Sequence, residues 1–288
     1  MVKNFLKNQK IGLILRTFST KIQSVDSRII QLRKIVELAE VMKIDGENIF
    51  SRIDILVWND QGFAEKDCGE TFGLVREAFK NNQNVFVHDF HNGDIFCSIL
   101  NFGIGIQLRN GIDYSAIAST EIFSYFSSTN LSPMIEALDK GALATGLAIN
   151  EIQESVMAGR LANTLAIWHN ISLLSVGSFD LRAAKAKDEK SALYLKGWNE
   201  EENKNLFYQL AGVEEVIPLV RMVENFGPCI FPVLPIEGGS YKIPDKTKEP
   251  ELYLRHLSKI GTKRERQNIF LALVGFDSSY LQGGIMSF

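Results

Sequence analysis

The feature of the sequence that most constrains the fold is an alternation of apolar runs with helical patterns between residues 10 and 121. The apolar runs are rich in Val, Ile and Leu, as is typical of strands buried on both faces of a sheet: KIGLILRTF, IDILVWND, NVFVHDF and IDYSAIAST. The segments between them space their apolar residues at helical intervals over residues 27–42, 71–81 and 93–108. This order predicts an α/β fold with a mostly parallel, Rossmann-like sheet flanked by helices.

The rest of the chain continues the mixture of strands and helices and predicts a helical C-terminal part. The expected strands are GALATGLAI and, as an edge strand or an extended loop, the proline-rich PCIFPVLPIEGG. The segment NEIQESVMAGR indicates an irregular loop. The expected helices cover residues 132–141, 161–174, 214–226, 251–260 and 262–274.

The composition is that of a folded protein without a general nucleic-acid-binding surface. Of the 288 residues, 45% are apolar, and 31 Lys or Arg against 34 Asp or Glu give a net charge of −3. The cysteines Cys68, Cys97 and Cys229 are odd in number and widely spaced, which favours reduced thiols over a disulfide framework or a zinc site. No apolar run has the length of a transmembrane segment, and the run over residues 11–15 is too short for a signal-peptide core. We therefore expect a cytoplasmic protein.

Several short motifs, taken in their order along the chain, resemble those of a known family. Arg16-Thr17 ends the first strand and Asn59-Asp60 ends the second. LNFGI follows at residues 100–104, and SVGSFDLRAA stands further on. This order resembles the nucleotide-binding half of a GT-A-type glycosyltransferase, most closely family 2, over roughly residues 10 to 185.

The sequence departs from the family pattern at specific positions. Where the family has Asp-x-Asp after the fourth strand, this chain has Ser119-Thr120-Glu121. Asn59 stands for the first acid of the second-strand pair. In the later turn, Ser178 replaces the second Gly and Leu181 replaces Glu.

The resemblance implies one continuous GT-A domain in two halves. Residues 1–125 would bind the nucleotide-sugar, and residues 126–288 would bind the acceptor and supply the helical C-terminal region. The implied activity is transfer of a sugar, with inversion, from a nucleotide-diphosphate donor such as a UDP-sugar to a carbohydrate or another hydroxyl acceptor.

Two other functions remain open at this point. The same scaffold, having lost transfer chemistry, would serve as a binding or assembly protein, and the missing acid favours that alternative. A nucleotidyltransferase on a related sheet would normally carry a Gly-rich phosphate loop after the first strand, and RTFSTK contains no Gly.

The donor site implied by the resemblance gathers residues from the ends of three strands. Arg16, Thr17, Asn59, Asp60 and Ser119 would line the nucleotide pocket, with Asp60 accepting hydrogen bonds from a uracil or ribose edge. The alternative for Asp60 is a turn residue or a helix N-cap. For Arg16 and Thr17 it is a surface cation and a helix-initiating hydroxyl.

Glu121 is the residue on which metal binding depends. It would act as a single carboxylate ligand of Mn²⁺ or Mg²⁺ on the donor diphosphate, with His256 as a further ligand. Alternatively, Glu121 hydrogen-bonds sugar hydroxyls, or it only complements a helix dipole. For His256 and the late Lys and Arg residues, the alternative is a solvated helix face.

Asp180 is the candidate general base. An inverting transfer needs a carboxylate that takes a proton from the acceptor hydroxyl, opposite the leaving diphosphate. The alternative is an Asx-turn residue that holds the loop after Gly177. His88 and His91 in HDFH are expected to lie in a loop, without a metal.

Overall fold

The computed structural model describes residues 2–18, 25–58, 70–90, 96–120, 125–151, 155–180 and 214–233, together with 246–248, 250, 253, 271 and 274–277. Its helices are α1 (Val2–Asn8), α2 (Val25–Val41), α3 (Glu70–Phe79), α4 (Phe96–Arg109), α5 (Ser128–Asp139), α6 (Asn170–Ser175) and α8 (Val216–Phe226). Its strands are β1 (Ile11–Phe18), β2 (Lys43–Ile44), β3 (Glu47–Asn48), β4 (Phe50–Trp58), β5 (Val85–Phe90), β6 (Tyr114–Ala118), β7 (Ala144–Glu151), β8 (Ser155–His169) and β9 (Ile230–Val233).

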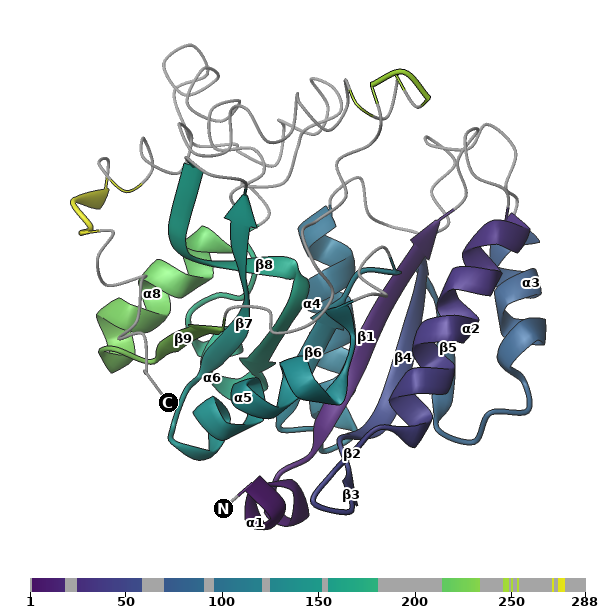
Figure 1. Cartoon of the computed structure of the whole chain (residues 1–288), viewed down its shortest axis with the longest axis horizontal. Helices are drawn as coiled ribbons and strands as arrows, with labels where there is room; N and C mark the ends of the chain where they lie inside the picture. Colours follow the sequence, from purple (N-terminus) through teal and green to yellow (C-terminus); the bar gives the residue numbers. More distant parts are fainter. Residues whose placement is uncertain are drawn as a thin grey trace.

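A seven-stranded sheet in the order β5-β4-β1-β6-β8-β7-β9 forms the centre of the protein (Figure 1). Strands β5, β4, β1 and β6 are parallel to one another, whereas β8 runs antiparallel to both of its neighbours. The chain proceeds outward from β1 to β4 and β5, and then returns to β6 on the other side of β1. The expected mostly parallel α/β sheet is therefore confirmed, and the order of the strands reverses between β1 and β6.

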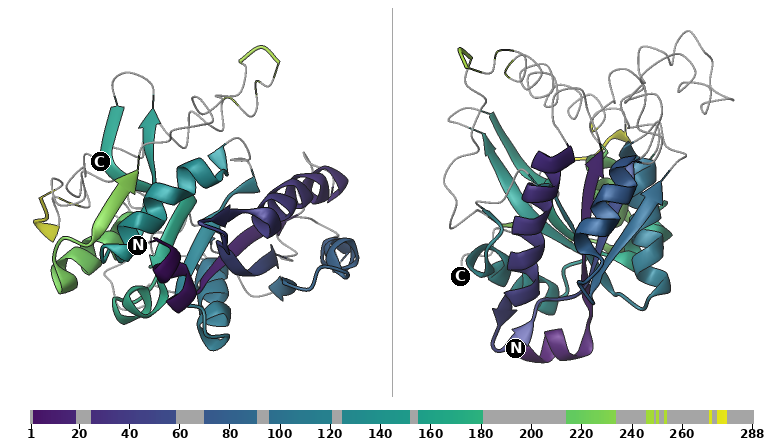
Figure 2. Two further views of the ribbon diagram at one scale, coloured as in Figure 1. Left: turned by 60° about the horizontal axis from the view of Figure 1, so that its bottom comes forward. Right: turned by 90° about the vertical axis from the view of Figure 1, so that its right-hand side faces the viewer.

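Helices cover both faces of this sheet, as the right-hand view of Figure 2 shows. One hydrophobic core joins one face of the strands to α2, α3 and α5 through residues that include Leu15, Leu32, Val75 and Met134. The other core joins the opposite face to α4, α6 and α8 through residues that include Ile14, Leu100, Leu173 and Leu219. Strands between two helical layers are buried on both faces, which explains their nearly continuous apolar runs.

The expected helix over residues 161–174 is wrong. Residues 155–169 form β8, which pairs with β6 and β7, and only Asn170–Ser175 is helical. Leu161, Leu165 and Trp168 have helical spacing, but Ala166 and Ile167 between them are equally buried because β8 has a core on each face. The segment expected to be an irregular loop also contributes to β7 and β8.

The helix expected from residue 132 begins earlier. Its N-cap is Ser127, whose hydroxyl accepts a hydrogen bond from the backbone N–H of Asn130 at 3.3 Å, and Pro133 lies inside the helix. The edge-strand interpretation of the proline-rich segment is confirmed for Ile230–Val233, which pairs with β7. The expected helices over residues 251–260 and 262–274 lie almost entirely outside the described residues.

A buried polar network lies between β4, β5 and α4. Asp54, with 0% of its surface exposed, accepts hydrogen bonds from Arg52 at 2.9 Å, His88 Nε2 at 2.7 Å and Gln107 at 3.1 Å. Burial alone would raise the pKa of Asp54, but the hydrogen bonds from His88, Arg52 and Gln107 and the Arg52 charge lower it below its usual value. His88 therefore belongs to a strand and to this network, not to the loop that was expected.

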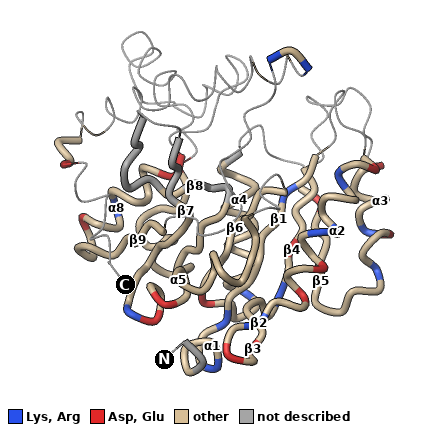
Figure 3. Tube along the Cα trace, viewed as in Figure 1, with Lys and Arg blue, Asp and Glu red and all other residues tan. Residues whose placement is uncertain are grey.

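Charges of both signs are interspersed along the described chain (Figure 3). Among the described residues, no helix combines the length and the apolar character that a membrane crossing requires. One sheet contains strands from both predicted halves of the chain, before and after residue 125.

Candidate functional site

The carboxyl ends of β1, β4 and β6 meet at one edge of the sheet, where the order of the strands reverses. Such a switch point is where open α/β sheets bind ligands. Thr17 of β1 pairs with Val57 of β4, and Leu15 pairs with Ala118, the last residue of β6. Ser119 follows directly. The structure thus brings Arg16, Thr17 and Ser119 to a common edge.

Arg16 and Thr17 point to opposite faces of the sheet because side chains alternate along a strand. Arg16 shares the α4 side with Ile14, and Thr17 shares the α2 side with Leu15. Thr17 is only 1% exposed, and its hydroxyl has no hydrogen-bond partner among the described residues. An unsatisfied buried hydroxyl is costly, so this one requires an explanation.

An aromatic pair lies at the same edge of the sheet, at the ends of β1 and β4. The rings of Phe18 and Trp58 meet edge to face with centroids 6.0 Å apart, and the guanidinium of Arg28 lies 4.4 Å above the Phe18 ring. The pair ends β1 and β4, and Arg28 comes from the first turns of α2. Such a surface suits a planar ring that also carries negative charge, as a nucleotide does.

The turn that carries Asp180 is held by α4. The side-chain amide of Asn101 donates to the carbonyl of Phe179 at 2.9 Å and accepts from the N–H of Phe179 at 3.0 Å. The Phe179 ring is buried against Trp168, with centroids 5.2 Å apart. LNFGI and SVGSFDLRAA, two of the segments that carry the family resemblance, are therefore in direct contact.

Asp180 is paired with an arginine of α8. Its Oδ2 accepts a hydrogen bond from Arg221 Nη2 at 2.9 Å, and Arg221 Nη1 also donates to the carbonyl of Val176 at 3.3 Å. Asp180 is 9% exposed, so most of the residue is shielded from water. The ion pair favours the ionised form of the carboxylate, which is the form that accepts a proton.

Cys97, at the start of α4, links the two parts of the site. Burial, followed by the negative charges of Glu214 and Asp180, raises the pKa of its thiol well above the usual value, and the charge of Arg16 opposes this. Cys97 is therefore a buried thiol rather than a nucleophile. Charged groups from β1, from the Asp180 turn and from the segment before α8 all influence the pKa of this thiol.

Several predicted site residues lie outside the described residues: Asn59, Asp60, Glu121 and His256. Among the residues that are described, no three His, Cys, Asp or Glu side chains form a group that could hold a metal ion. The described side chains therefore do not form a metal centre by themselves, and the metal roles of Glu121 and His256 stay predictions.

Asn101 and Arg221 were not identified from the sequence as site residues. Asn101 stands inside LNFGI, but nothing in that motif indicates which backbone it binds 78 residues away. Arg221 was visible only as a cation in the otherwise apolar stretch VIPLVRMV of a predicted helix. A charge in such a stretch indicates a buried partner, although not which one.

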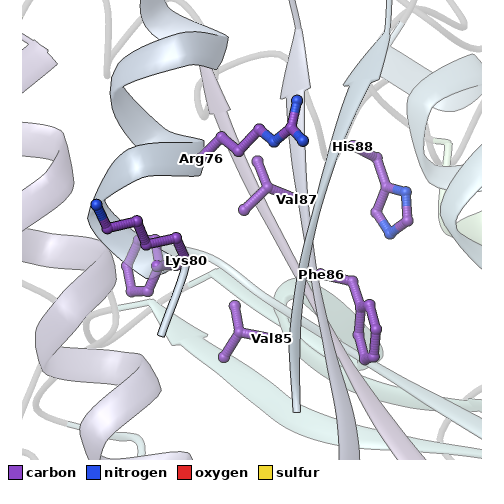
Figure 4. Close-up of a pocket in the computed structure, with 7 residues that line it drawn as sticks. Arg76, Lys80, Val85, Phe86, Val87 and His88 are labelled. Atoms are coloured by element: carbon purple, nitrogen blue, oxygen red, sulfur yellow. The ribbon is translucent and has the colours of Figure 1, made fainter. Parts of the chain in front are cut away.

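A separate pocket of about 340 Å³ lies at the outer edge of the sheet, along β5 (Figure 4). Arg76 reaches it from α3 and Lys80 from the turn after α3, and Phe86 and His88 lie on the other side of the strand in Figure 4. It is lined by Arg76, Phe79, Lys80, Val85, Phe86, Val87 and His88. None of the predicted site residues belongs to it.

Solved structures similar to this chain include enzymes that transfer nucleotides or sugars. A cytidylyltransferase from Leptospira borgpetersenii serovar Hardjo-bovis has a TM-score of 0.45 at 12% identity, covering 97% of this chain and 100% of its own. A 4-diphosphocytidyl-2C-methyl-D-erythritol synthase from Anaerococcus prevotii has a TM-score of 0.37 at 10% identity, covering 70% and 83%. Mouse xyloside xylosyltransferase 1 has a TM-score of 0.38 at 9% identity, covering 78% and 85%.

No protein-family model matches the sequence, and no curated protein matches it. TM-scores below 0.5 at these identities assign no activity to this chain. A functional assignment therefore depends on the described residues themselves.

Proposed function

We propose that this protein is a glycosyltransferase that moves a sugar from a nucleotide-diphosphate donor to a hydroxyl acceptor, with inversion at the anomeric carbon. The observation that carries the proposal is the pair of hydrogen bonds between Asn101 and Phe179. These bonds hold the turn of the candidate base against α4, which packs on the same face of the sheet as Arg16 at the end of β1. A donor across the strand ends and an acceptor beside Asp180 would then be neighbours.

In the proposed reaction, Asp180 takes the proton of the acceptor hydroxyl while that oxygen attacks the anomeric carbon. The bond between the anomeric carbon and the diphosphate oxygen breaks on the opposite face, and its electron pair leaves with the diphosphate. Arg16 would offset part of the charge that develops on the leaving group. A metal held by Glu121 and His256 would add to this neutralisation.

The Thr17 hydroxyl, which has no hydrogen-bond partner among the described residues, supports the proposal of a ligand at this edge of the sheet. A polar group buried without a partner costs about 1–3 kcal/mol. A nucleotide that reaches the end of β1 would offer oxygen and nitrogen partners to this hydroxyl. The Phe18 and Trp58 rings lie at the same strand ends, with Trp58 on the α4 face, and would contact the base.

The proposal is tested by thermal shift with nucleoside diphosphates, nucleotide-sugars and nucleoside triphosphates, each with and without Mg²⁺ or Mn²⁺. A ligand that binds only the folded protein raises the melting temperature, and the equivalent of about 2.7 kcal/mol is gained at a hundred times Kd. We expect UDP and at least one nucleotide-sugar to produce a shift. The protein should then release nucleoside diphosphate from that nucleotide-sugar, and Asp180→Asn should abolish release while leaving donor binding intact.

Three results would contradict the proposal in different ways. A shift with triphosphates alone, together with pyrophosphate release, would indicate a nucleotidyltransferase. Nucleotide-sugar binding without release, for any acceptor tested, would indicate a binding or assembly protein. Full turnover by the Asp180→Asn variant would exclude Asp180 as the base.

A further inference from the structure

The turn from Val176 to Asp180 has a strained backbone. Gly177 has a φ of +91°, and the next residue, Ser178, has a φ of +58°. A non-glycine residue in the left-handed region costs about 1–2 kcal/mol. Such strain persists only where the surroundings impose the conformation, and it is concentrated at functional sites. The contacts that hold this conformation therefore point to the function of the turn.

Arg221 spans both ends of this turn. One nitrogen of its guanidinium binds the carbonyl of Val176 at 3.3 Å, and another binds Oδ2 of Asp180 at 2.9 Å. Between the two ends, a Cβ added to Gly177 would lie 3.3 Å from Arg221 Nη1, so the guanidinium lies directly against the backbone of the turn. A planar guanidinium fixes two acceptors in one geometry, which the single ammonium of a lysine does not do.

The positive charge of Arg221 also compensates the negative charge of the buried Asp180 carboxylate. A carboxylate that is 91% buried requires a counter-ion or several hydrogen bonds, and Arg221 supplies an ion pair to it. The Arg221 side chain is 33% exposed, so this contact is near the surface and the pair is only partly shielded from water. The contact therefore orients the carboxylate and favours its charged form.

We infer that Arg221 is the positioning residue of Asp180: it fixes the strained turn at both ends and holds the carboxylate in the ionised, oriented form needed to accept a proton. This inference rests on the proposed sugar transfer, in which Asp180 is the base. Through Arg221, helix α8 from the second half of the chain would position the base of the proposed reaction. Asn101 fixes the middle of the same turn, and Arg221 fixes the charged side chain.

The inference predicts a specific kinetic pattern. Nucleotide release from UDP-glucose, UDP-N-acetylglucosamine and GDP-mannose, with water as the acceptor, is compared for the wild type, Arg221→Met, Arg221→Lys, Asp180→Asn and the double variant. We expect Arg221→Met to lower kcat about 100-fold with little change in KM, because misplacing a reacting group by about 1 Å has an effect of this size. Arg221→Lys should recover part of the loss. The double variant should be no slower than Asp180→Asn, because both changes act through one carboxylate.

A second readout does not depend on turnover. Hydrogen exchange at the amides of residues 177–180 should become about tenfold faster in Arg221→Met, while the amides of β1 and β4 stay protected. Arg33→Met, which removes an exposed arginine of α2, is the matched control and should change neither the exchange nor kcat.

The outcomes separate the inference from the function on which it rests. A wild-type protein that releases no nucleotide from any donor would refute the proposed function, whereas the exchange data would still show whether Arg221 fixes the turn. An active wild type with an equally active Arg221→Met variant would refute the role of Arg221 alone. Losses that multiply in the double variant would show that Arg221 acts independently of Asp180, which also overturns the inference.

Discussion

Asn101 in α4 and Phe179 in the turn after α6 bind each other through two reciprocal hydrogen bonds of 2.9 and 3.0 Å, although 78 residues separate them. The side-chain amide satisfies both the N–H and the carbonyl of one backbone unit. The arrangement joins α4 to the turn after α6 within the layer that covers one face of the sheet. It also sets where Asp180, the next residue, lies.

Asn101→Ala should therefore destabilise the protein well beyond the loss of one surface contact. Both backbone groups of Phe179 lose their partner in a partly buried place, which should lower the free energy of unfolding by about 2–4 kcal/mol. Asn101→Asp keeps the acceptor for the N–H and should show an intermediate loss. Urea unfolding measures both. Asn8→Ala, which removes an exposed amide bonded to Asn4, is the control, and an Asn101→Ala variant as stable as this control would contradict the prediction.

Asp54→Asn should show the largest effect in the core. The change removes the buried carboxylate that pairs with the partly buried Arg52, and breaking such an ion pair costs about 3–5 kcal/mol. Because the pKa of Asp54 is lowered in the folded protein, its contribution is complete above the unfolded pKa of about 4 and is lost as the pH falls through the lower folded value. Urea unfolding at several pH values should therefore show the wild type and the variant converging below about pH 4.

The control for Asp54 is Glu37→Gln, which removes an exposed carboxylate of α2. It should change the stability by less than about 0.5 kcal/mol at pH 7. An Asp54→Asn variant that loses no more than this control, or a difference from the wild type that is constant down to pH 3, would contradict the role assigned to the network.

Gly12→Ala tests the packing around the same network. A Cβ at this position would lie 2.5 Å from Nε2 of Gln107, whose amide is held by Ser115 at 2.6 Å and by Asp54 at 3.1 Å. The amide has little freedom to move away, so overpacking should cost about 1–3 kcal/mol. Gly73→Ala is the opposite case, because nothing lies within 4 Å of the added Cβ on an exposed helix position. Gly73→Ala should raise the free energy of unfolding by about 0.5–1 kcal/mol. Equal changes for Gly12→Ala and Gly73→Ala in urea unfolding would contradict the prediction.

The strands of the parallel half of the sheet could be predicted because local pattern and tertiary environment agree there. Strands such as Ile11–Phe18 lie between two helical layers, so burial on both faces produces an uninterrupted apolar run. The same burial misled the prediction at β8. A strand that is buried on both faces has no period of two, and its leucines were spaced by chance as in a helix.

The site divides in a similar way. Arg16, Thr17 and Ser119 could be placed at one edge because the carboxyl ends of parallel strands share an edge whatever the details of packing. Arg221 meets Asp180 across 41 residues, and Asn101 meets Phe179 across 78. Contacts of this kind depend on how the helices pack against the sheet. The periodicity of a single sequence does not indicate that packing.

The unsatisfied hydroxyl of Thr17 provides a test in which stability and binding move in opposite directions. Thr17→Val replaces a buried hydroxyl, which has no partner among the described residues, with a methyl group of similar size. The variant should gain about 1 kcal/mol in urea unfolding and lose about tenfold in affinity for UDP by calorimetry, since the ligand loses a hydrogen bond of about 1.4 kcal/mol. Thr145→Val is the matched control: its equally buried hydroxyl donates to the carbonyl of Phe231 at 2.7 Å near the start of β7, away from the carboxyl ends of β1, β4 and β6. It should lose stability and leave UDP affinity unchanged. A Thr17→Val variant that loses stability as Thr145→Val does would show that the hydroxyl already has a partner, and a more stable variant with intact affinity would show that the nucleotide does not contact Thr17.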